Sequence, residues 1–266
     1  MVMSIKQVLT IAGSDSGGGA GIQADLKAIS AHGAYGMTVL TSITAQNTKE
    51  VTAVHDLPSS MIEAQLDAVF SDFDVAVVKT GMLSSIDIIE TVHKKLTHYQ
   101  VTNLIVDPVM VSKSGYPLLQ KEAIQVLKTH LIPKALLVTP NIHEAEILAG
   151  MKIQNLTEAR QAAKVIQTLG CRHVLIKGGH FREKPAMDLF YDGRFFRMYP
   201  GEFIETSHTH GTGCTYASAI AANLAKGKAL PDAIEASKRY ITAAIRHSLA
   251  IGHGNGPTNH FYFLPQ

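Results

Sequence analysis

Ten residues, Thr206-Ser-His-Thr-His-Gly-Thr-Gly-Cys-Thr215, combine polar side chains, two glycines and a thiol just before an alanine-rich run, Tyr216–Ala225, that is typical of a helix. The first turn of a helix has backbone N–H groups without partners, and the helix dipole places partial positive charge there. Gly211 and Gly213 have no Cβ, so an anion could approach these donors closely. Cys214 falls in the same environment, which makes a thiol more acidic and more reactive. The pattern predicts an anion site that contains a reactive group; the alternative is a glycine-rich loop that caps a buried helix.

Side chains suited to phosphate and metal chemistry follow short apolar runs elsewhere in the chain. Asp107 ends one run, where a carboxylate could hold Mg²⁺ through water or could simply cap the loop before a proline. Lys177 ends another run beside two glycines, where it could meet a phosphate. Asn141 and Glu144 suit a helix start, as N-cap and first-turn carboxylate. Together with an anion site, these groups predict phosphoryl transfer, in which positioning and charge neutralisation supply most of the catalysis.

Two stretches near the N-terminus could bind the organic part of a substrate. Gly13–Gly21 is a glycine-rich loop between an apolar run and a helical pattern, which indicates either a backbone-lined ligand site or only a tight turn. It lacks the Gly-Lys-Ser/Thr of a Walker loop and the spacing of a dinucleotide loop. Gln46 follows the next strand-like run, and its amide offers the donor and the acceptor that suit an aminopyrimidine-like edge. A single glutamine there can equally be an ordinary loop residue.

The composition limits the classes of partner. The chain has 266 residues, of which 46% are hydrophobic and 17% charged, and its formal net charge is only +2 with no long basic run, so nucleic acid is not an expected partner. Cys171 and Cys214 make no disulfide framework and fit a reducing compartment. We expect a cytoplasmic protein, because there is no signal-peptide pattern and no apolar run long enough to span a membrane. Zinc chemistry is not expected, and His208 and His210 are interpreted as loop residues.

The elements that must position these groups alternate between strands and helices along almost the whole chain. The expected strands are Val8–Ala12, Gly36–Ala45, Val51–His55, Val75–Lys79, Leu104–Asp107, Ala135–Thr139, His173–Lys177 and a hairpin, Met187–Tyr191 with Arg194–Met198, joined by a type I′ Asp-Gly turn. The expected helices are Ile22–Ala31, Met61–Phe70 (capped by Ser59 or Ser60), Ile86–Leu96, Lys121–Leu131, Glu144–Ala149, a helix from Thr157 to near Gly170, Tyr216–Ala225 and Pro231–Leu249. This order predicts an α/β fold with a doubly wound, mostly parallel sheet, in which residues 1–266 form a single domain. Polar groups at the strand ends should then face one crevice: Gly13, Gln46, Gly81, Asp107, Asn141 and Lys177.

Seven motifs together resemble the ribokinase-like kinases, and most closely the hydroxymethylpyrimidine/phosphomethylpyrimidine kinases of thiamine biosynthesis. They cover nearly the full chain in order: Thr10–Lys27, Thr44–Thr48, Lys79–Met82, Val106–Gly115, Thr139–Glu144, Lys177–His180 and Thr209–Thr215. The resemblance implies a ribokinase-like domain that uses ATP and Mg²⁺ to phosphorylate the hydroxymethyl group of 4-amino-5-hydroxymethyl-2-methylpyrimidine. It implies that the same site then phosphorylates the monophosphate to the diphosphate. It also implies a homodimer.

The resemblance assigns a role to each matching residue. Cys214 would be the base that takes the hydroxymethyl proton, where sugar kinases of the superfamily have an aspartate, and a thiolate at a helix N-terminus suits that role. The N–H groups of Gly211, Thr212 and Gly213 would receive the charge of the transferring phosphoryl group. The remaining roles are Gln46 at the pyrimidine edge, with Gly13, Asp25, Met82 and Val109 around the ring; Asp107 and Glu144 at Mg²⁺ or its waters; and Asn141 and Lys177 facing ATP.

Two other functions are compatible with parts of the pattern. Related pyridoxal kinases phosphorylate a similar ring, but they tend to have a second cysteine where this chain has Ser112, and they lack the Ala-Gln-Asn-Thr stretch retained in Thr44–Thr48. Both departures favour the pyrimidine, with pyridoxal or pyridoxine as a side substrate. A non-catalytic pyrimidine-binding protein would keep Gln46 but would have no need for Cys214 and Asp107 together with the anion site.

Overall fold

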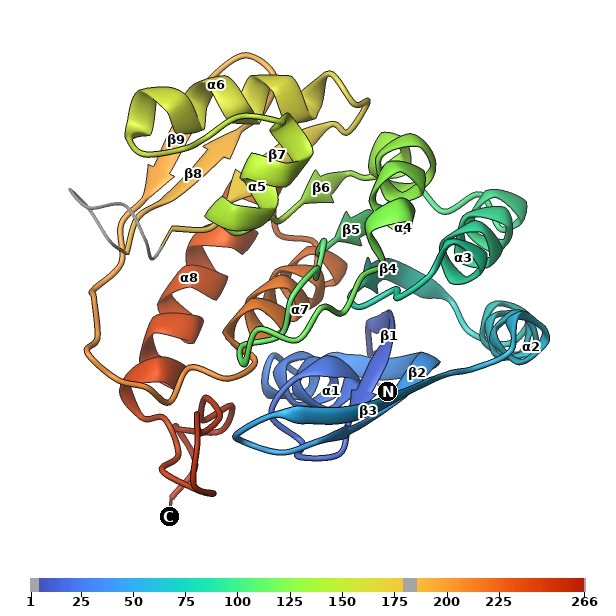
Figure 1. The fold of residues 1–266 in the computed structure, drawn as a ribbon, viewed down its shortest axis with the longest axis horizontal. Coiled ribbons are helices and arrows are strands. Elements are labelled where there is room, and N and C mark those ends of the chain that lie inside the picture. Colours follow the sequence, from blue (N-terminus) through green and yellow to red (C-terminus); the bar gives the residue numbers. More distant parts are fainter. Residues whose placement is uncertain (1–4, 179–185, 266) are drawn as a thin grey trace.

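A nine-stranded sheet runs through the molecule in the order β3-β2-β1-β4-β5-β6-β7-β8-β9 (Figure 1). The structure is a computed structural model and describes residues 5–178 and 186–265. The strands are β1 (Gln7–Asp15), β2 (Tyr35–Gln46), β3 (Val51–Asp56), β4 (Val75–Thr80), β5 (Leu104–Val106), β6 (Leu137–Val138), β7 (His173–Ile176), β8 (Asp188–Tyr191) and β9 (Phe196–Tyr199). Strands β2, β1, β4, β5, β6 and β7 pair in parallel, whereas β3, β8 and β9 pair antiparallel at the two edges. The predicted mostly parallel sheet with an added hairpin is therefore confirmed.

Helices cover both faces of the sheet, which explains why its central strands are almost continuously apolar. One face packs on α2 (Ser59–Phe70), α3 (Ile86–His98), α4 (Lys121–Val126), α5 (Ile142–Ala149) and α6 (Leu156–Gln167). The other face packs on α1 (Gly21–Ala31), α7 (Thr212–Ala225) and α8 (Leu230–Arg246) (Figure 1). In β1, neighbouring residues such as Val8 and Leu9 belong to opposite core layers and are both completely buried.

The carboxyl ends of the parallel strands are level with one another. Ile11 pairs with Thr80, Thr80 with Val106, and Val106 with Val138. The chain passes from β1 to β2 on one side and later returns to β4 on the other side of β1, so the strand order reverses next to β1. In open α/β sheets, ligands bind beyond the carboxyl ends of the strands at such a reversal.

Several predicted boundaries need correction. Helix α2 has Pro58 rather than Ser59 or Ser60 at its N-cap. The predicted helix Lys121–Leu131 consists of α4 followed by a π-helical turn, Leu127–Leu131. Strand β1 continues through Gly13 to Asp15, so the glycine turn is shorter than predicted.

The hairpin turn and the start of α7 also differ from expectation. Tyr191 pairs with Phe196, so four residues join β8 and β9, and the two-residue type I′ turn was wrong. Among the described residues only Gln100 and glycines have a positive φ, whereas a type I′ turn needs one at Asp192 as well. Helix α7 begins at Thr212, earlier than predicted, so that Cys214 lies in its first turn. No helix within residues 5–178 and 186–265 is both long and apolar enough to cross a membrane.

Candidate active site

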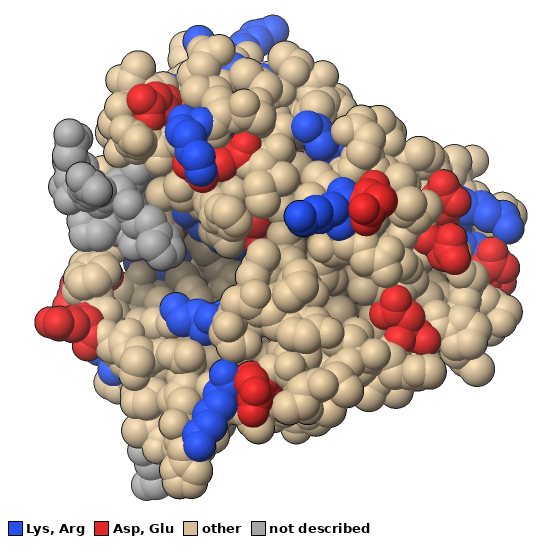
Figure 2. Space-filling model, viewed as in Figure 1, with Lys and Arg blue, Asp and Glu red and all other residues tan. Residues whose placement is uncertain are grey.

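A cavity of about 1140 Å³ lies beyond the carboxyl ends of the parallel strands. Figure 2 shows its hollow on the viewed face, with basic side chains at the rim. Nearly all the residues predicted to act together line it: Gly13, Gln46, Met82, Asp107, Val109, Asn141, Glu144, Lys177, Gly211, Thr212, Gly213 and Cys214. Asp25 and Gly81 are not among the lining residues. Gly179 and His180, part of a predicted motif, lie outside the described residues.

The N-terminus of α7 forms one wall of the cavity. Gly211 is the N-cap residue, and its φ of 76° lies in the left-handed region that favours glycine. A Cβ at Gly211 would collide with the carbonyl oxygen of Gly19, so the residue is required both by its conformation and by a close approach of two loops. No side-chain cap satisfies the first N–H groups of α7. The Thr212 N–H donates to the Thr209 carbonyl at 3.3 Å, so the N–H groups of Gly213 and Cys214, which have no hydrogen-bond partner among the described residues, are the ones available to an anion in the cavity.

Replacing Gly211 with alanine is expected to lower the free energy of unfolding by about 1–3 kcal/mol, because it adds both backbone strain and a steric overlap with Gly19. Gly227 is a matched control, since its φ is also positive, 86°, but no atom lies within 4 Å of the position that a Cβ would take there. Urea unfolding of the two alanine variants checks the prediction. Equal losses at both positions would contradict the inferred close approach.

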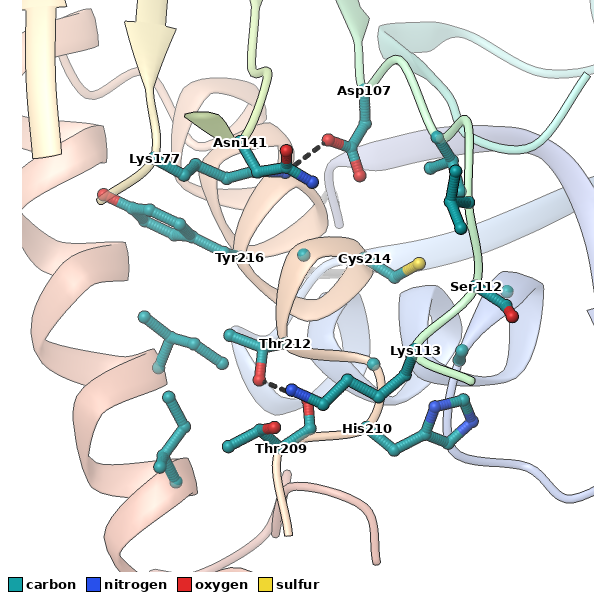
Figure 3. A pocket seen from close by; sticks show the side chains of 18 of the residues that line it. Asp107, Ser112, Lys113, Asn141, Lys177, Thr209, His210, Thr212, Cys214 and Tyr216 are labelled. Atoms are coloured by element: carbon teal, nitrogen blue, oxygen red, sulfur yellow. Dashed lines mark hydrogen bonds and ion pairs between the residues drawn. The ribbon is translucent and has the colours of Figure 1, made fainter. Parts of the chain in front are cut away.

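Cys214 faces the cavity from the first turn of α7 (Figure 3). Burial raises the pKa of its thiol to about 11, and the positive charge of Lys79 opposes this rise only in part. The negative charges of Asp25 and Asp107 raise the pKa further. The expectation of a more acidic thiol was therefore wrong, because the effect of burial on the pKa outweighs that of the helix N-terminus. Once its proton is lost, such a thiolate is a strong base.

Asp107 and Lys177 form an ion pair directly opposite the start of α7. Lys177 Nζ lies 2.6 Å from Asp107 Oδ1, which also accepts a hydrogen bond of 2.8 Å from Thr139 Oγ1 (Figure 3). A Cβ on Gly213 would lie 3.2 Å from Lys177 Nζ and 3.7 Å from Asp107 Oδ2, so both groups face the α7 N-terminus. Burial tends to raise the pKa of Asp107, but Lys177 and Lys79 hold it below its usual value.

Asn141 and Glu144 confirm the predicted helix cap and also line the cavity. Asn141 Oδ1 accepts the Glu144 N–H at 2.9 Å, and Glu144 Oε2 accepts the Asn141 N–H at 2.8 Å, which is a capping box at the start of α5. Burial raises the pKa of Glu144 to about 7, and Asp107 adds to this effect while Lys177 opposes it.

The acidic side chains of the cavity fit Mg²⁺ better than a metal that needs a complete protein cage. Within the described part of the chain, no cluster of three or more His, Cys, Asp or Glu side chains could hold a metal. Mg²⁺ commonly keeps several waters and uses only one or two carboxylates together with phosphate oxygens. Asp107 and Glu144 meet that lesser requirement, since both line the cavity.

Asp25 occupies a different position from the one expected. Its carboxylate is completely buried behind the cavity, where it accepts two hydrogen bonds of 2.9 Å from Lys79 Nζ. Thr10 Oγ1 and Ser218 Oγ donate to it at 2.6 and 2.7 Å. The expected contact of Asp25 with a ring is corrected on this basis, because the carboxylate joins β1, β4, α1 and α7 instead of lining the cavity.

The far end of the cavity contains groups that the sequence did not single out. His210 and Asp15 form a buried pair beside Gln46, with 2.9 Å between His210 Nε2 and Asp15 Oδ2. The chain separation of 195 residues hides this pair from any local pattern. Asp188 and Lys238 form a second pair at 2.8 Å, near Tyr216 and residues 202–207, and extend the cavity toward α8. For the pair formed by Asp15 and His210, the only signal in the sequence was the run of glycines after Asp15, because their N–H groups can donate hydrogen bonds to the Asp15 carboxylate.

The family model and the curated relatives that match this chain indicate the same family. The family model described as phosphomethylpyrimidine kinase matches residues 15–259. The hydroxymethylpyrimidine/phosphomethylpyrimidine kinase of Bacillus subtilis is 47% identical over 262 residues, which cover 98% of this chain and 97% of that protein. The thiamine biosynthesis bifunctional protein ThiED of Geobacter sulfurreducens is 53% identical over 95% of this chain, but the match spans only 52% of that longer protein.

A solved structure shows the same fold with a different named substrate. The ADP complex of Bacillus subtilis pyridoxal kinase superimposes with a TM-score of 0.91 at 42% identity, covering 98% of this chain and 99% of that one. The fold is thus common to proteins named for two substrates, so the fold alone does not identify the substrate.

Proposed function

The chain belongs to the phosphomethylpyrimidine kinase family, and we propose on this basis that it is an ATP-dependent kinase of thiamine biosynthesis. It phosphorylates 4-amino-5-hydroxymethyl-2-methylpyrimidine and then converts the monophosphate to the diphosphate. The observation that carries this function is that one cavity contains both a glutamine amide suited to an aminopyrimidine edge and an anion site with a thiol. A binding protein would have no use for the second half of this arrangement.

Cys214 is the proposed base for the first transfer. The hydroxymethyl oxygen forms a bond to the γ-phosphorus of ATP, the bond from that phosphorus to the bridging oxygen of ADP breaks, and the hydroxyl proton passes to the Cys214 thiolate. The N–H groups of Gly211, Thr212 and Gly213 at the start of α7 would receive the charge on the transferring group. In the second transfer the nucleophile is a phosphate oxygen, which needs no base to ionise it at neutral pH.

The ATP side of the cavity is assigned to the pair formed by Lys177 and Asp107 and to the start of α5. Lys177 offers a positive charge to the phosphates, and Asn141 lines the same wall. Asp107 and Glu144 would hold Mg²⁺ or its waters. When bound, Mg²⁺ neutralises phosphate charge and holds the phosphates in a fixed geometry. Around the ring, Gly13, Met82 and Val109 supply the apolar contacts next to Gln46.

The activity of the free enzyme is expected to rise with pH over the neutral range. Because the Cys214 pKa is raised to about 11, the thiolate fraction grows about tenfold for each pH unit below that value. Ionisation of Glu144, with its pKa of about 7, adds to the rise at lower pH. Log kcat/KM for the pyrimidine should therefore still increase between pH 8 and pH 9.

A Cys214→Asp variant separates the contributions of Cys214 and Glu144 to this pH profile. The same burial would raise the pKa of an aspartate at this position, but from a much lower starting value than that of a thiol, so the rise that the thiol causes above about pH 8 should disappear and kcat/KM should level off there. A wild-type profile that levels off at the same pH would remove Cys214 from the base role.

Product analysis tests the function itself. Purified protein incubated with Mg-ATP and the hydroxymethylpyrimidine should form the monophosphate first and then the diphosphate, both visible by phosphorus NMR. ATP consumption without either pyrimidine product would overturn the assignment.

Pyridoxal is the second candidate substrate, and the likeness of the cavity-bearing fold to a pyridoxal kinase favours it as a side activity. Ser112 lines the cavity at the place where related pyridoxal kinases tend to have a cysteine. The homodimer is a further prediction of the family resemblance, whereas the cytoplasmic location and the single domain are predictions from the composition and the order of the elements. Size-exclusion chromatography with light scattering tests the dimer.

A further inference from the structure

A hydrogen-bond network beside the ring site joins Asp15, His210 and Gln46. His210 Nε2 lies 2.9 Å from Asp15 Oδ2 and 3.3 Å from Gln46 Nε2. The other atom of the Gln46 amide, Oε1, lies 3.2 Å from Thr44 Oγ1. Figure 3 shows His210 on the loop that leads to Thr212 and Cys214. The network therefore touches the residue that reads the ring and the loop that precedes the anion site.

The proton in this network can be placed from its partners. Asp15 Oδ1 accepts the Gly17 N–H at 2.8 Å, and Oδ2 accepts those of Gly19 and Ala20 at 3.0 and 2.8 Å. Burial tends to raise the pKa of Asp15, but the hydrogen bonds from His210 and these backbone groups hold it below its usual value. An ionised carboxylate can only accept hydrogen bonds, so the Nε2 atom of His210 must carry a hydrogen and donate it.

This donor decides the orientation of the Gln46 amide. With its nitrogen toward His210, Gln46 would set one N–H donor against another, whereas a half-turn of the amide directs the carbonyl oxygen to His210. The half-turn also directs the NH₂ group to Thr44 Oγ1. That hydroxyl donates its single hydrogen to the Ser14 carbonyl at 2.8 Å, so it is able to accept from Gln46. Only this orientation satisfies every group in the network.

We propose that His210 is a positioning residue that fixes which end of the Gln46 amide accepts and which end donates, and so sets the donor and acceptor order that the site requires of the ring. This inference rests on the proposed pyrimidine kinase function. With one lone pair and one hydrogen engaged by His210 and Thr44, the amide can still accept one hydrogen bond and donate one, side by side. An aminopyrimidine edge offers the matching pair, an exocyclic amino donor next to a ring nitrogen acceptor.

The backbone of His210, like its side chain, is fixed by hydrogen bonds. Its N–H donates to the Gly256 carbonyl at 3.1 Å, and its carbonyl accepts the Thr258 N–H at 3.3 Å. A Cβ on Gly19 would overlap the His210 ring, so the glycine allows the ring to lie against the loop. His210 directly precedes Gly211, and the ring-reading amide is thereby tied to the start of α7.

The test compares the natural substrate with its 4-oxo analogue, in which oxygen replaces the 4-amino group. The analogue presents the reverse order, a carbonyl acceptor next to a ring N–H donor. Wild-type protein is expected to prefer the amino compound by about 10⁴-fold or more in kcat/KM, as sites built around specific hydrogen bonds do. In His210→Leu the amide is free to turn, and this preference should fall by at least about tenfold.

Two further variants exclude a general loss of structure. His210→Gln retains an N–H donor for Asp15 and should keep more of the preference than His210→Leu. His208→Leu is the matched control from the same loop, because His208 Nδ1 accepts the Gly256 N–H and does not touch Gln46; its preference should equal that of wild type. An unchanged preference in His210→Leu, with measurable turnover of the amino compound, overturns the positioning role alone. Wild-type protein that phosphorylates neither pyrimidine overturns the proposed function instead.

Discussion

Replacing Cys214 with alanine is expected to reduce kcat for the first phosphorylation by about 10²–10⁴-fold, the usual contribution of a general base. The thiol lines the cavity at the start of α7, and its removal should leave the proposed contact between Gln46 and the ring unchanged. The affinity for the hydroxymethylpyrimidine, measured by calorimetry, should therefore change little. The second phosphorylation should be less affected, because its phosphate nucleophile is already ionised.

The other cysteine provides a control for the loss of a thiol. Cys171 is buried in the core, where its Sγ donates a long hydrogen bond of 3.6 Å to the Ile166 carbonyl, and it does not line the cavity. Cys171→Ala should leave kcat unchanged. A Cys214→Ala protein that turns over at the wild-type rate contradicts the base assignment, whatever its stability.

Replacing Lys79 with methionine is expected to lower the free energy of unfolding by about 3–5 kcal/mol, because it leaves the Asp25 carboxylate buried without its cation. Both side chains are completely buried. The Asp25 carboxylate of α1 pairs with Lys79 of β4 and also accepts hydrogen bonds from side chains of β1 and α7. The charge of Asp25 cannot reach water, so it must be neutralised or the fold must open. Urea unfolding at neutral pH measures the loss.

Two comparisons keep this prediction specific. Lys94→Met breaks an exposed pair with Glu63 and should cost about 0–1 kcal/mol. Adding Asp25→Leu to Lys79→Met removes the unpaired charge and should restore part of the stability, although Thr10 and Ser218 then lose their acceptor. A Lys79→Met loss no larger than that of Lys94→Met contradicts the burial of the pair.

The strand-end residues were predictable because each depends on a local pattern. Asp107 and Lys177 each follow a short apolar run, and parallel strands place all such ends at one edge of the sheet. The cap formed by Asn141 and Glu144 likewise depends on only four consecutive residues. These features require only the fold class and the order of the strands.

Other features depend on distant parts of the chain and were not predictable in this way. His210 was interpreted as a loop residue, and no local pattern could have shown its pairing with Asp15, which lies 195 residues away. The Cys214 pKa moved in the opposite direction from the one expected, since the helix N-terminus is a local effect and burial is a tertiary one. The family resemblance implied a contact between Asp25 and the ring. The ion pair of Asp25 with Lys79 forms only when β1, β4 and α7 are assembled, so no local pattern shows it.

In the proposed function, the choice of substrate depends on the amide of Gln46 and on the side chains that orient it. One competition experiment addresses it: wild-type protein with limiting Mg-ATP and equal concentrations of 4-amino-5-hydroxymethyl-2-methylpyrimidine and pyridoxal, with products separated by chromatography. Pyrimidine monophosphate and diphosphate should dominate, and pyridoxal phosphate should be a minor product. A mixture in which pyridoxal phosphate dominates contradicts the assignment of this cavity to the pyrimidine.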